Sequence, residues 1–151
     1  YAAGPSNVIN AMNKVQSQNV SSTASISMAA SVEALNGDQS FINSNNESFL
    51  RRRNLVVKNL NETPGLSCRT PEGAFYVFAS CKGILGKKTE TGKVLDTDGD
   101  FMDYLLEEVG VAGVQGSAFG LDGFFRISYA TSDSILEDAC QRIKKACSKL
   151  S

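Results

Sequence analysis

The dipeptide Pro64-Gly65 divides the chain into two parts with different hydrophobic patterns. Proline cannot continue a helix because it lacks an N–H donor, and glycine readily takes the left-handed conformation that ends one. Before this dipeptide, apolar residues recur at helical spacing. After it, short runs of β-prone and aromatic residues alternate with helical stretches. We therefore expect an α+β fold in which helices precede a short sheet packed with further helices.

The expected elements follow from the same patterns. In the first part, helices are predicted from Pro5 to about residue 16, from Ser25 to Leu35 with a left-handed stop at Asn36-Gly37, and from Gln39 to Leu60. A polar, Ser-rich loop is predicted over residues 17–25. In the second part, strands are predicted at 74–79, 111–114 and 124–129, and helices at 99–109 and from Ser132 onward.

Composition and charge narrow the class of protein. Hydrophobic residues make up 42% of the chain and charged residues 21%, which is enough for a globular core. The formal net charge of −1 gives no reason to expect nucleic acid or an anionic membrane as a partner. No apolar run approaches the roughly 18 residues of a membrane span. The chain has no histidine, which excludes Ser/His/Asp and Cys/His triads.

The four cysteines give no sign of a metal or redox site. Cys68, Cys81, Cys140 and Cys147 lack C-x-x-C spacing, and no histidine could complete a zinc site. Cys140 and Cys147 lie seven residues apart on one face of the last helix, where they suit core positions. We expect reduced thiols in a cytoplasmic protein, with a disulfide as the alternative.

Two other motifs imitate ligand sites without meeting their requirements. Four carboxylates have the spacing of EF-hand ligands: Asp96, Asp98, Asp100 and Glu107. Phe101 stands where that loop requires glycine, so no calcium site is expected. The Gly- and Lys-containing segment 86–93 lacks the spacing of a phosphate-binding loop. The run Arg51–Arg53 is expected to form a solvated helix face, with an interface as the alternative.

Arg126 is the strongest candidate for a binding residue. It lies in the strand-like segment Phe124-Phe-Arg-Ile-Ser-Tyr129, where alternation places Phe124, Arg126 and Ser128 on one face. A guanidinium on a half-buried strand needs an anion, because burying it unpaired is costly. Either a carboxylate of the protein pairs with it, or the site is left for a ligand carboxylate or phosphate, which the planar fork binds in bidentate fashion.

Several segments together resemble the class I aminotransferases of fold-type I, specifically the aspartate aminotransferase type. They occur in order: Tyr-Ala-Ala-Gly-Pro at 1–5, Val-Glu-Ala-Leu-Asn-Gly-Asp-Gln at 32–39, Pro-Glu-Gly-Ala-Phe-Tyr at 71–76, Val-Gln-Gly-Ser-Ala-Phe-Gly at 114–120 and Phe-Arg-Ile-Ser-Tyr-Ala-Thr at 125–131. The resemblance covers essentially the whole chain. It implies an α/β-family fold divided into the end of the large domain (1–45), a connecting helix (46–63) and the small domain (64–151).

The resemblance also implies roles for particular residues. Arg126 matches the arginine that binds the substrate α-carboxylate, and Phe75 is expected to line the mouth of the active site. The family transfers an amino group between an L-amino acid and a 2-oxo acid through pyridoxal 5'-phosphate. Its members act as homodimers. The family's Schiff-base lysine and the arginine that holds the cofactor phosphate lie upstream of the position matching Tyr1, so neither has a counterpart in this chain.

We therefore expect a C-terminal part of an aminotransferase. By itself it should bind no cofactor, contain no catalytic residue and be inactive. A start at Tyr1, without methionine and within an apolar stretch, also suggests a piece of something longer. Two alternatives differ in class. One is a stand-alone α+β module that holds a carboxylate with Arg126. The other is a structural fragment that associates through apolar faces such as Val8, Ile9, Met12 and Val15.

Overall fold

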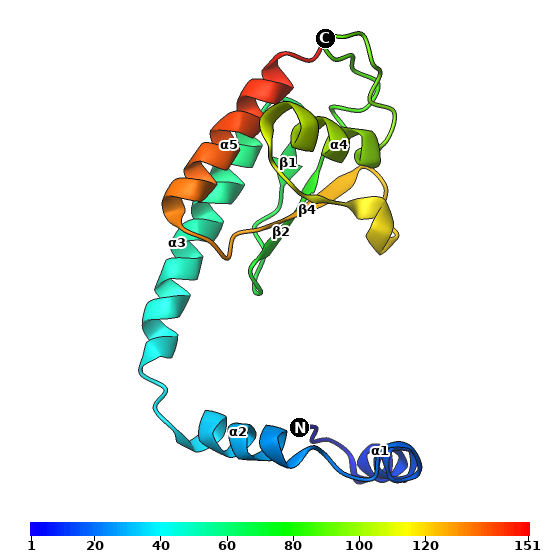
Figure 1. Ribbon diagram of the computed structural model, residues 1–151, viewed down its shortest axis with the longest axis vertical. Helices are drawn as coiled ribbons and strands as arrows, with labels where there is room; N and C mark the ends of the chain where they lie inside the picture. Colours follow the sequence, from blue (N-terminus) through cyan, green and yellow to red (C-terminus); the bar gives the residue numbers. More distant parts are fainter. The chain divides into compact units, whose positions relative to one another are not determined.

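The computed structural model describes all 151 residues, which form two compact units, residues 1–42 and 43–151 (Figure 1). The helix α3 (Phe41–Asn61) begins at the end of the first unit and continues into the second. No helix combines the length and apolar character needed to cross a membrane.

The first unit contains two helices and no core. Helix α1 (Ser6–Asn19) starts after Pro5, whose carbonyl accepts hydrogen bonds from the N–H groups of Val8 and Ile9. Helix α2 (Ser25–Asn36) follows. Neither helix contains a buried residue, and the apolar side chains of Met12 and Val15 are exposed.

Two predictions for the first unit were wrong. Helix α1 continues to Asn19, so the loop is shorter than expected. Gly37 does not take a left-handed conformation: it is extended, with φ −75° and ψ −175°. The amide of Gln39 donates a hydrogen bond to the carbonyl of Ala34 at 2.8 Å. This side chain satisfies a carbonyl at the helix end, which a left-handed glycine would otherwise help to do.

The second unit is built around a four-stranded antiparallel sheet with strand order β1-β2-β4-β3. The strands are β1 (Ser67–Cys68), β2 (Tyr76–Ser80), β3 (Val114–Gln115) and β4 (Phe124–Ser128). In the central pair, Phe78 lies opposite Arg126. The predicted strand 111–114 is almost entirely absent, because Val111 still donates its N–H to Leu105 and so completes the end of a helix.

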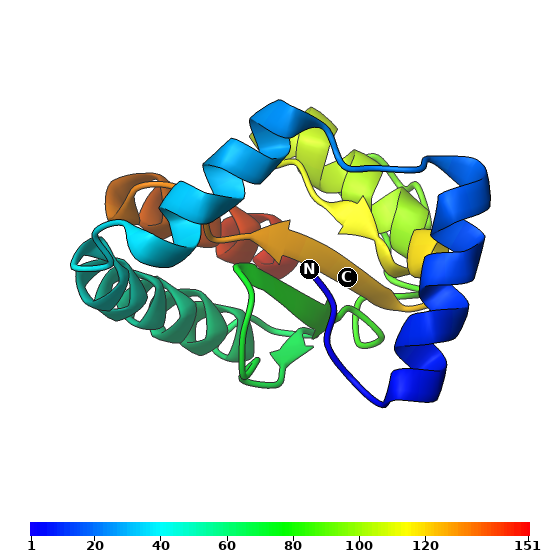
Figure 2. The same ribbon diagram turned by 90° about the horizontal axis from the view of Figure 1, so that it is seen from below.

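Helices cover one face of this sheet. Helix α4 (Asp98–Val109) and helix α5 (Asp133–Ser148) lie behind the strands in Figure 2. Helix α3 runs beside α5 in the same direction (Figure 1). The fully buried residues Val77, Ala79 and Phe125 point to this side, and the Phe101 ring of α4 packs edge-on against Phe125 at 5.5 Å. The structure therefore has the expected α+β fold.

The Arg51–Arg53 run is only partly a solvated face: Arg51 is exposed, whereas Arg52 and Arg53 are half-buried. Arg51 and Arg52 both donate to the carboxylate of Asp133, at 2.7 and 2.8 Å, and Arg53 donates to the carbonyl of Pro71 at 3.1 Å. These bonds connect α3 to the start of α5 and to the turn before β2.

The last helix follows its prediction closely. The hydroxyl of Ser132 accepts a hydrogen bond from the N–H of Ile135, as the expected N-cap does. Cys140 and Cys147 are buried in the core, as expected from their spacing. Ile135 is the exception on the apolar stripe, because it is exposed.

Candidate functional site

Arg126 lies on the open face of the sheet, away from the helices. Its neighbour Phe125 is fully buried against α4, so alternation turns Arg126 to the opposite side. On that side the pairing of β2 with β4 sets Phe78 opposite Arg126 and Tyr76 opposite Ser128. The predicted shared face of Phe124, Arg126 and Ser128 is thus part of a wider surface rich in aromatic rings.

Two of these rings contact the guanidinium directly. The Arg126 Cζ atom lies 4.4 Å from the centroid of the Tyr76 ring and 4.6 Å from that of Phe119. Both contacts are in the range of favourable cation–π interactions. The Arg126 side chain forms no salt bridge and no hydrogen bond within this chain. The structural ion pair considered from the sequence therefore has no partner among the 151 residues.

Phe119 reaches Arg126 from the 3-10 helix η1 (Gly116–Phe119), between β3 and β4. The segment turns back through Gly120, which has a left-handed φ of +78° that few other residues adopt. The Phe119 ring also meets the Phe78 ring edge-on at 6.0 Å.

Phe75, the other predicted site residue, lies beside this group and not in contact with Arg126. Its ring is 4.5 Å from that of Tyr76, which in turn contacts the guanidinium. Phe75 is 42% exposed and borders a cleft of about 560 Å³. The cleft is lined by Asn46, Phe49, Leu50, Arg53, Pro71, Glu72, Gly73, Ala74, Phe75 and Tyr129. Tyr76 thus bridges the two predicted residues.

Sequence reasoning missed Tyr76 and Phe119. Tyr76 could have been found, because alternation along the strand puts it on the same face as Phe78 and antiparallel pairing would bring that face to Arg126. Phe119 had no comparable signal, since its position depends on the path of an irregular loop.

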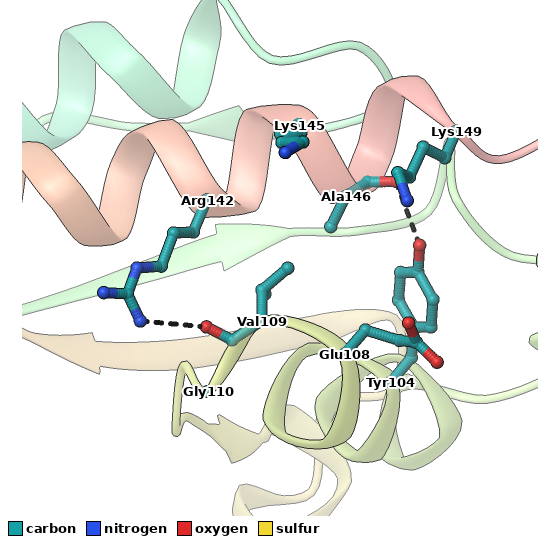
Figure 3. Close-up of a pocket in the computed structure, with 8 residues that line it drawn as sticks. All are labelled: Tyr104, Glu108, Val109, Gly110, Arg142, Lys145, Ala146 and Lys149. Atoms are coloured by element: carbon teal, nitrogen blue, oxygen red, sulfur yellow. Dashed lines mark hydrogen bonds between the residues drawn. The ribbon is translucent and has the colours of Figure 1, made fainter.

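A second cleft lies between α4 and α5, but its polar groups are mostly paired within the chain (Figure 3). Arg142 donates to the carbonyl of Val109 at 3.3 Å and pairs with Asp138. Lys149 pairs with Glu90 at 2.7 Å, and the Tyr104 hydroxyl donates to the carbonyl of Ala146. The cleft therefore offers few groups to a ligand.

The cysteines are free, buried and resistant to ionisation. Burial raises the pKa of Cys81 and Cys140 to about 11 and that of Cys147 to about 12. A thiol that stays protonated is a poor nucleophile and metal ligand. No cluster of three or more His, Cys, Asp or Glu side chains could hold a metal ion.

The lysines of the chain are all at least partly exposed. None is buried, and Lys82, which lies 5.2 Å from the Phe124 ring centroid, is exposed. A lysine that forms a Schiff base is usually desolvated or placed near another cation, so that its amine is neutral.

The small antiparallel sheet with helices on one face is the α+β fold of a fragment of a fold-type I aminotransferase. The sequence profile of the family "Aminotransferase class I and II" matches residues 1–143, and the chain belongs to this family.

Two relatives are similar over nearly the whole chain. The aspartate aminotransferase of Rhizobium meliloti (strain 1021) is 59% identical over 151 residues, and a probable aspartate/prephenate aminotransferase of Rhizobium leguminosarum bv. phaseoli is 56% identical over 147. These alignments cover 100% and 97% of this chain but 37% of each relative. The chain therefore spans little more than a third of the length of the relatives that it matches.

Solved structures of aspartate aminotransferases are similar to this chain over nearly its whole length. The crystal structure of the aspartate aminotransferase from Rhizobium meliloti has a TM-score of 0.88 at 59% identity, covering 99% of this chain and 38% of that one. The aspartate aminotransferase from Thermus thermophilus with maleate has a TM-score of 0.78 at 34% identity, covering 95% and 35%.

Proposed function

We propose that this chain is the substrate-anchoring C-terminal part of an aspartate-type aminotransferase, and that Arg126 binds the α-carboxylate of the amino-acid and 2-oxo-acid substrates. In this proposal residues 1–45 end the large domain, 46–63 connect the domains and 64–151 form the small domain. The parent protein is proposed to be a cytoplasmic homodimer, as the family resemblance implies. One observation carries the proposal: the Arg126 guanidinium lies against the rings of Tyr76 on β2 and Phe119 on η1 without any carboxylate partner in the chain.

The surroundings of Arg126 suit a planar anion. The rings of Tyr76 and Phe119 contact the guanidinium and limit how far it can move. Its N–H groups make no bond within the chain, so they are available to a carboxylate in the bidentate geometry that arginine favours. Binding one carboxylate in this way fixes the substrate's orientation, which is a contribution to catalysis through proximity.

We assign the amino-group transfer itself to the part of the parent protein that lies outside this chain. Pyridoxal phosphate supplies the electron sink for amino-group transfer in this family. Because no lysine of this chain is buried, we propose that the chain alone neither holds the cofactor covalently nor transaminates. After incubation with pyridoxal phosphate and reduction with borohydride, no single lysine should be labelled stoichiometrically. A single lysine labelled completely would contradict this.

The anchor role is tested in the full-length protein. Replacing Arg126 with alanine or lysine should raise the KM for the amino acid about 100-fold, because a charge-assisted bidentate contact is lost. Maleate, the dicarboxylate in the Thermus structure, should lose inhibition to a similar extent. The absorption spectrum of the bound cofactor should not change.

A matched arginine provides the control. Arg69 is exposed and forms no salt bridge, so Arg69→Ala should leave KM within about twofold of the wild type. If the Arg126 variants also kept a near-normal KM for dicarboxylic amino acids, Arg126 would not be the anchor.

A further inference from the structure

The position of Phe119 is set by its loop and not by burial in the core. Phe119 is 49% exposed, and its ring contacts the Phe78 ring and the Arg126 guanidinium. An exposed side chain normally samples several rotamers. Whether Phe119 stays against Arg126 therefore depends on how firmly the backbone of η1 is held.

The loop has little internal support. Two turn bonds join its ends: the N–H of Gly120 donates to Ser117 at 3.0 Å, and that of Leu121 donates to Gly116 at 3.1 Å. Gly116 packs so closely that an added Cβ would lie 2.8 Å from the Cβ of Phe124. Close contact fixes where the loop begins, and the two turn bonds are local to the loop.

Asp98 supplies the connection to the rest of the fold. It is the first residue of α4, it is only 3% exposed, and its Oδ2 accepts a hydrogen bond from the N–H of Ser117 at 2.7 Å. No lysine or arginine pairs with it. Burial raises the pKa of Asp98, but bonds from the backbone and hydroxyl of Ser117 and from the backbone of Gly123 outweigh this and lower it. The ionised form of Asp98 is therefore favoured, and its carboxylate bonds the start of the loop at Ser117.

Starting α4 does not require Asp98. Thr97 and Asp100 already form a capping box: the Asp100 N–H donates to the Thr97 hydroxyl at 3.0 Å, and the Thr97 N–H donates to the Asp100 carboxylate at 2.9 Å. A buried carboxylate without a cation is costly unless it is well hydrogen-bonded. The bond of Asp98 to the loop is thus its distinctive contribution.

We propose that Asp98 is a positioning residue for substrate binding: by holding Ser117 it keeps Phe119 against Arg126, and so fixes the guanidinium that receives the substrate carboxylate. This rests on the proposed function of Arg126. Asp98 itself touches neither substrate nor reacting atoms. Its loss is expected to weaken carboxylate binding while leaving the chemistry at the cofactor intact.

The test uses the full-length holoenzyme and compares three single variants and one double variant, the last measured against its Phe119→Ala background. Asp98→Ala should raise the KM for the amino acid and the inhibition constant for maleate about tenfold, with kcat within about twofold of wild type. Asp98→Asn keeps one oxygen acceptor and should recover part of this loss. Asp100→Ala removes the neighbouring carboxylate of the same helix turn, which does not bond the loop, and should leave both constants unchanged after thermal stability is compared.

The double variant tests whether Asp98 acts through Phe119. If Asp98 acts through Phe119, then Asp98→Ala made in a Phe119→Ala background should add less than about twofold to KM. A further tenfold rise in KM in that background would show that Asp98 does not act through Phe119. An unchanged KM in both Asp98 variants would overturn the proposal. Should Asp98→Ala fail to fold, an unchanged KM in Phe119→Ala overturns the proposal, because Asp98 is proposed to act through Phe119. Normal KM in Arg126→Ala would instead remove the proposed anchor, whatever Asp98 does.

Discussion

The hydroxyl of Tyr129 donates a hydrogen bond to the carbonyl of Ala74 at 2.9 Å, although the two residues lie 55 positions apart. Ala74 has a φ of +60°, in the left-handed region that L-residues rarely occupy. The bond therefore holds a strained turn just before Phe75. A second bond, from the N–H of Tyr129 to the carbonyl of Phe75 at 2.9 Å, closes the same contact.

Tyr129→Phe should lower the free energy of unfolding by about 1–2 kcal/mol, because the carbonyl of Ala74 loses its partner while the ring stays buried. Urea unfolding measures this. Tyr76→Phe is the matched control, since the Tyr76 hydroxyl makes no hydrogen bond in the structure, and it should change the stability by less than about 0.5 kcal/mol. Equal losses in the two variants would show that the bond to Ala74 contributes nothing specific.

Asp133 should make the stability depend on pH in the acid range. Hydrogen bonds from Arg51 and Arg52 lower its pKa from 3.8 to about 2. Because the folded value lies below the unfolded one, this stabilisation is complete above pH 3.8 and is lost as the pH falls toward 2. Asp133→Asn should therefore reduce the difference in unfolding free energy between pH 5 and about pH 2. High salt should reduce the effect, since the carboxylate is partly exposed.

The control for this prediction is Asp103→Asn on α4, whose carboxylate forms no salt bridge. It should leave the acid branch of the pH profile unchanged. If the wild type and Asp133→Asn lost stability in parallel below pH 4, the bonds of Asp133 to Arg51 and Arg52 would not contribute to the pH dependence of stability.

The C-terminus should contribute to stability through Leu150. This side chain is 7% exposed, and the next residue, Ser151, exchanges two backbone hydrogen bonds with Lys88, at 2.9 and 3.1 Å. Leu150→Ala should cost about 2–4 kcal/mol, as cavity-forming substitutions of buried leucine do. Leu106 is 54% exposed on α4, so Leu106→Ala should cost less than about 0.5 kcal/mol by the same measurement. A small loss at Leu150 would mean that the C-terminal segment frays.

Local features were predictable because they depend on contiguous residues. The helical period identified α5, with Ser132 as its N-cap and Cys140 and Cys147 in the core. Alternation identified the face on which Arg126 lies. Errors arose where a distant or irregular contact replaced a local signal. Gln39 satisfies a helix-end carbonyl in place of a left-handed Gly37, and Val111 extends the end of α4 in place of a strand.

The sequence by itself determined the α+β class, the helical and strand periods, the family resemblance and the candidate Arg126. Only the tertiary structure decided what surrounds that residue: Tyr76 from the neighbouring strand, Phe119 from η1, and Asp98 behind the loop that carries Phe119. It also turned Arg51 and Arg52 toward Asp133, about 80 positions away. Periodicity records which side of an element is apolar, whereas partners from distant segments depend on packing between elements, which no local pattern encodes.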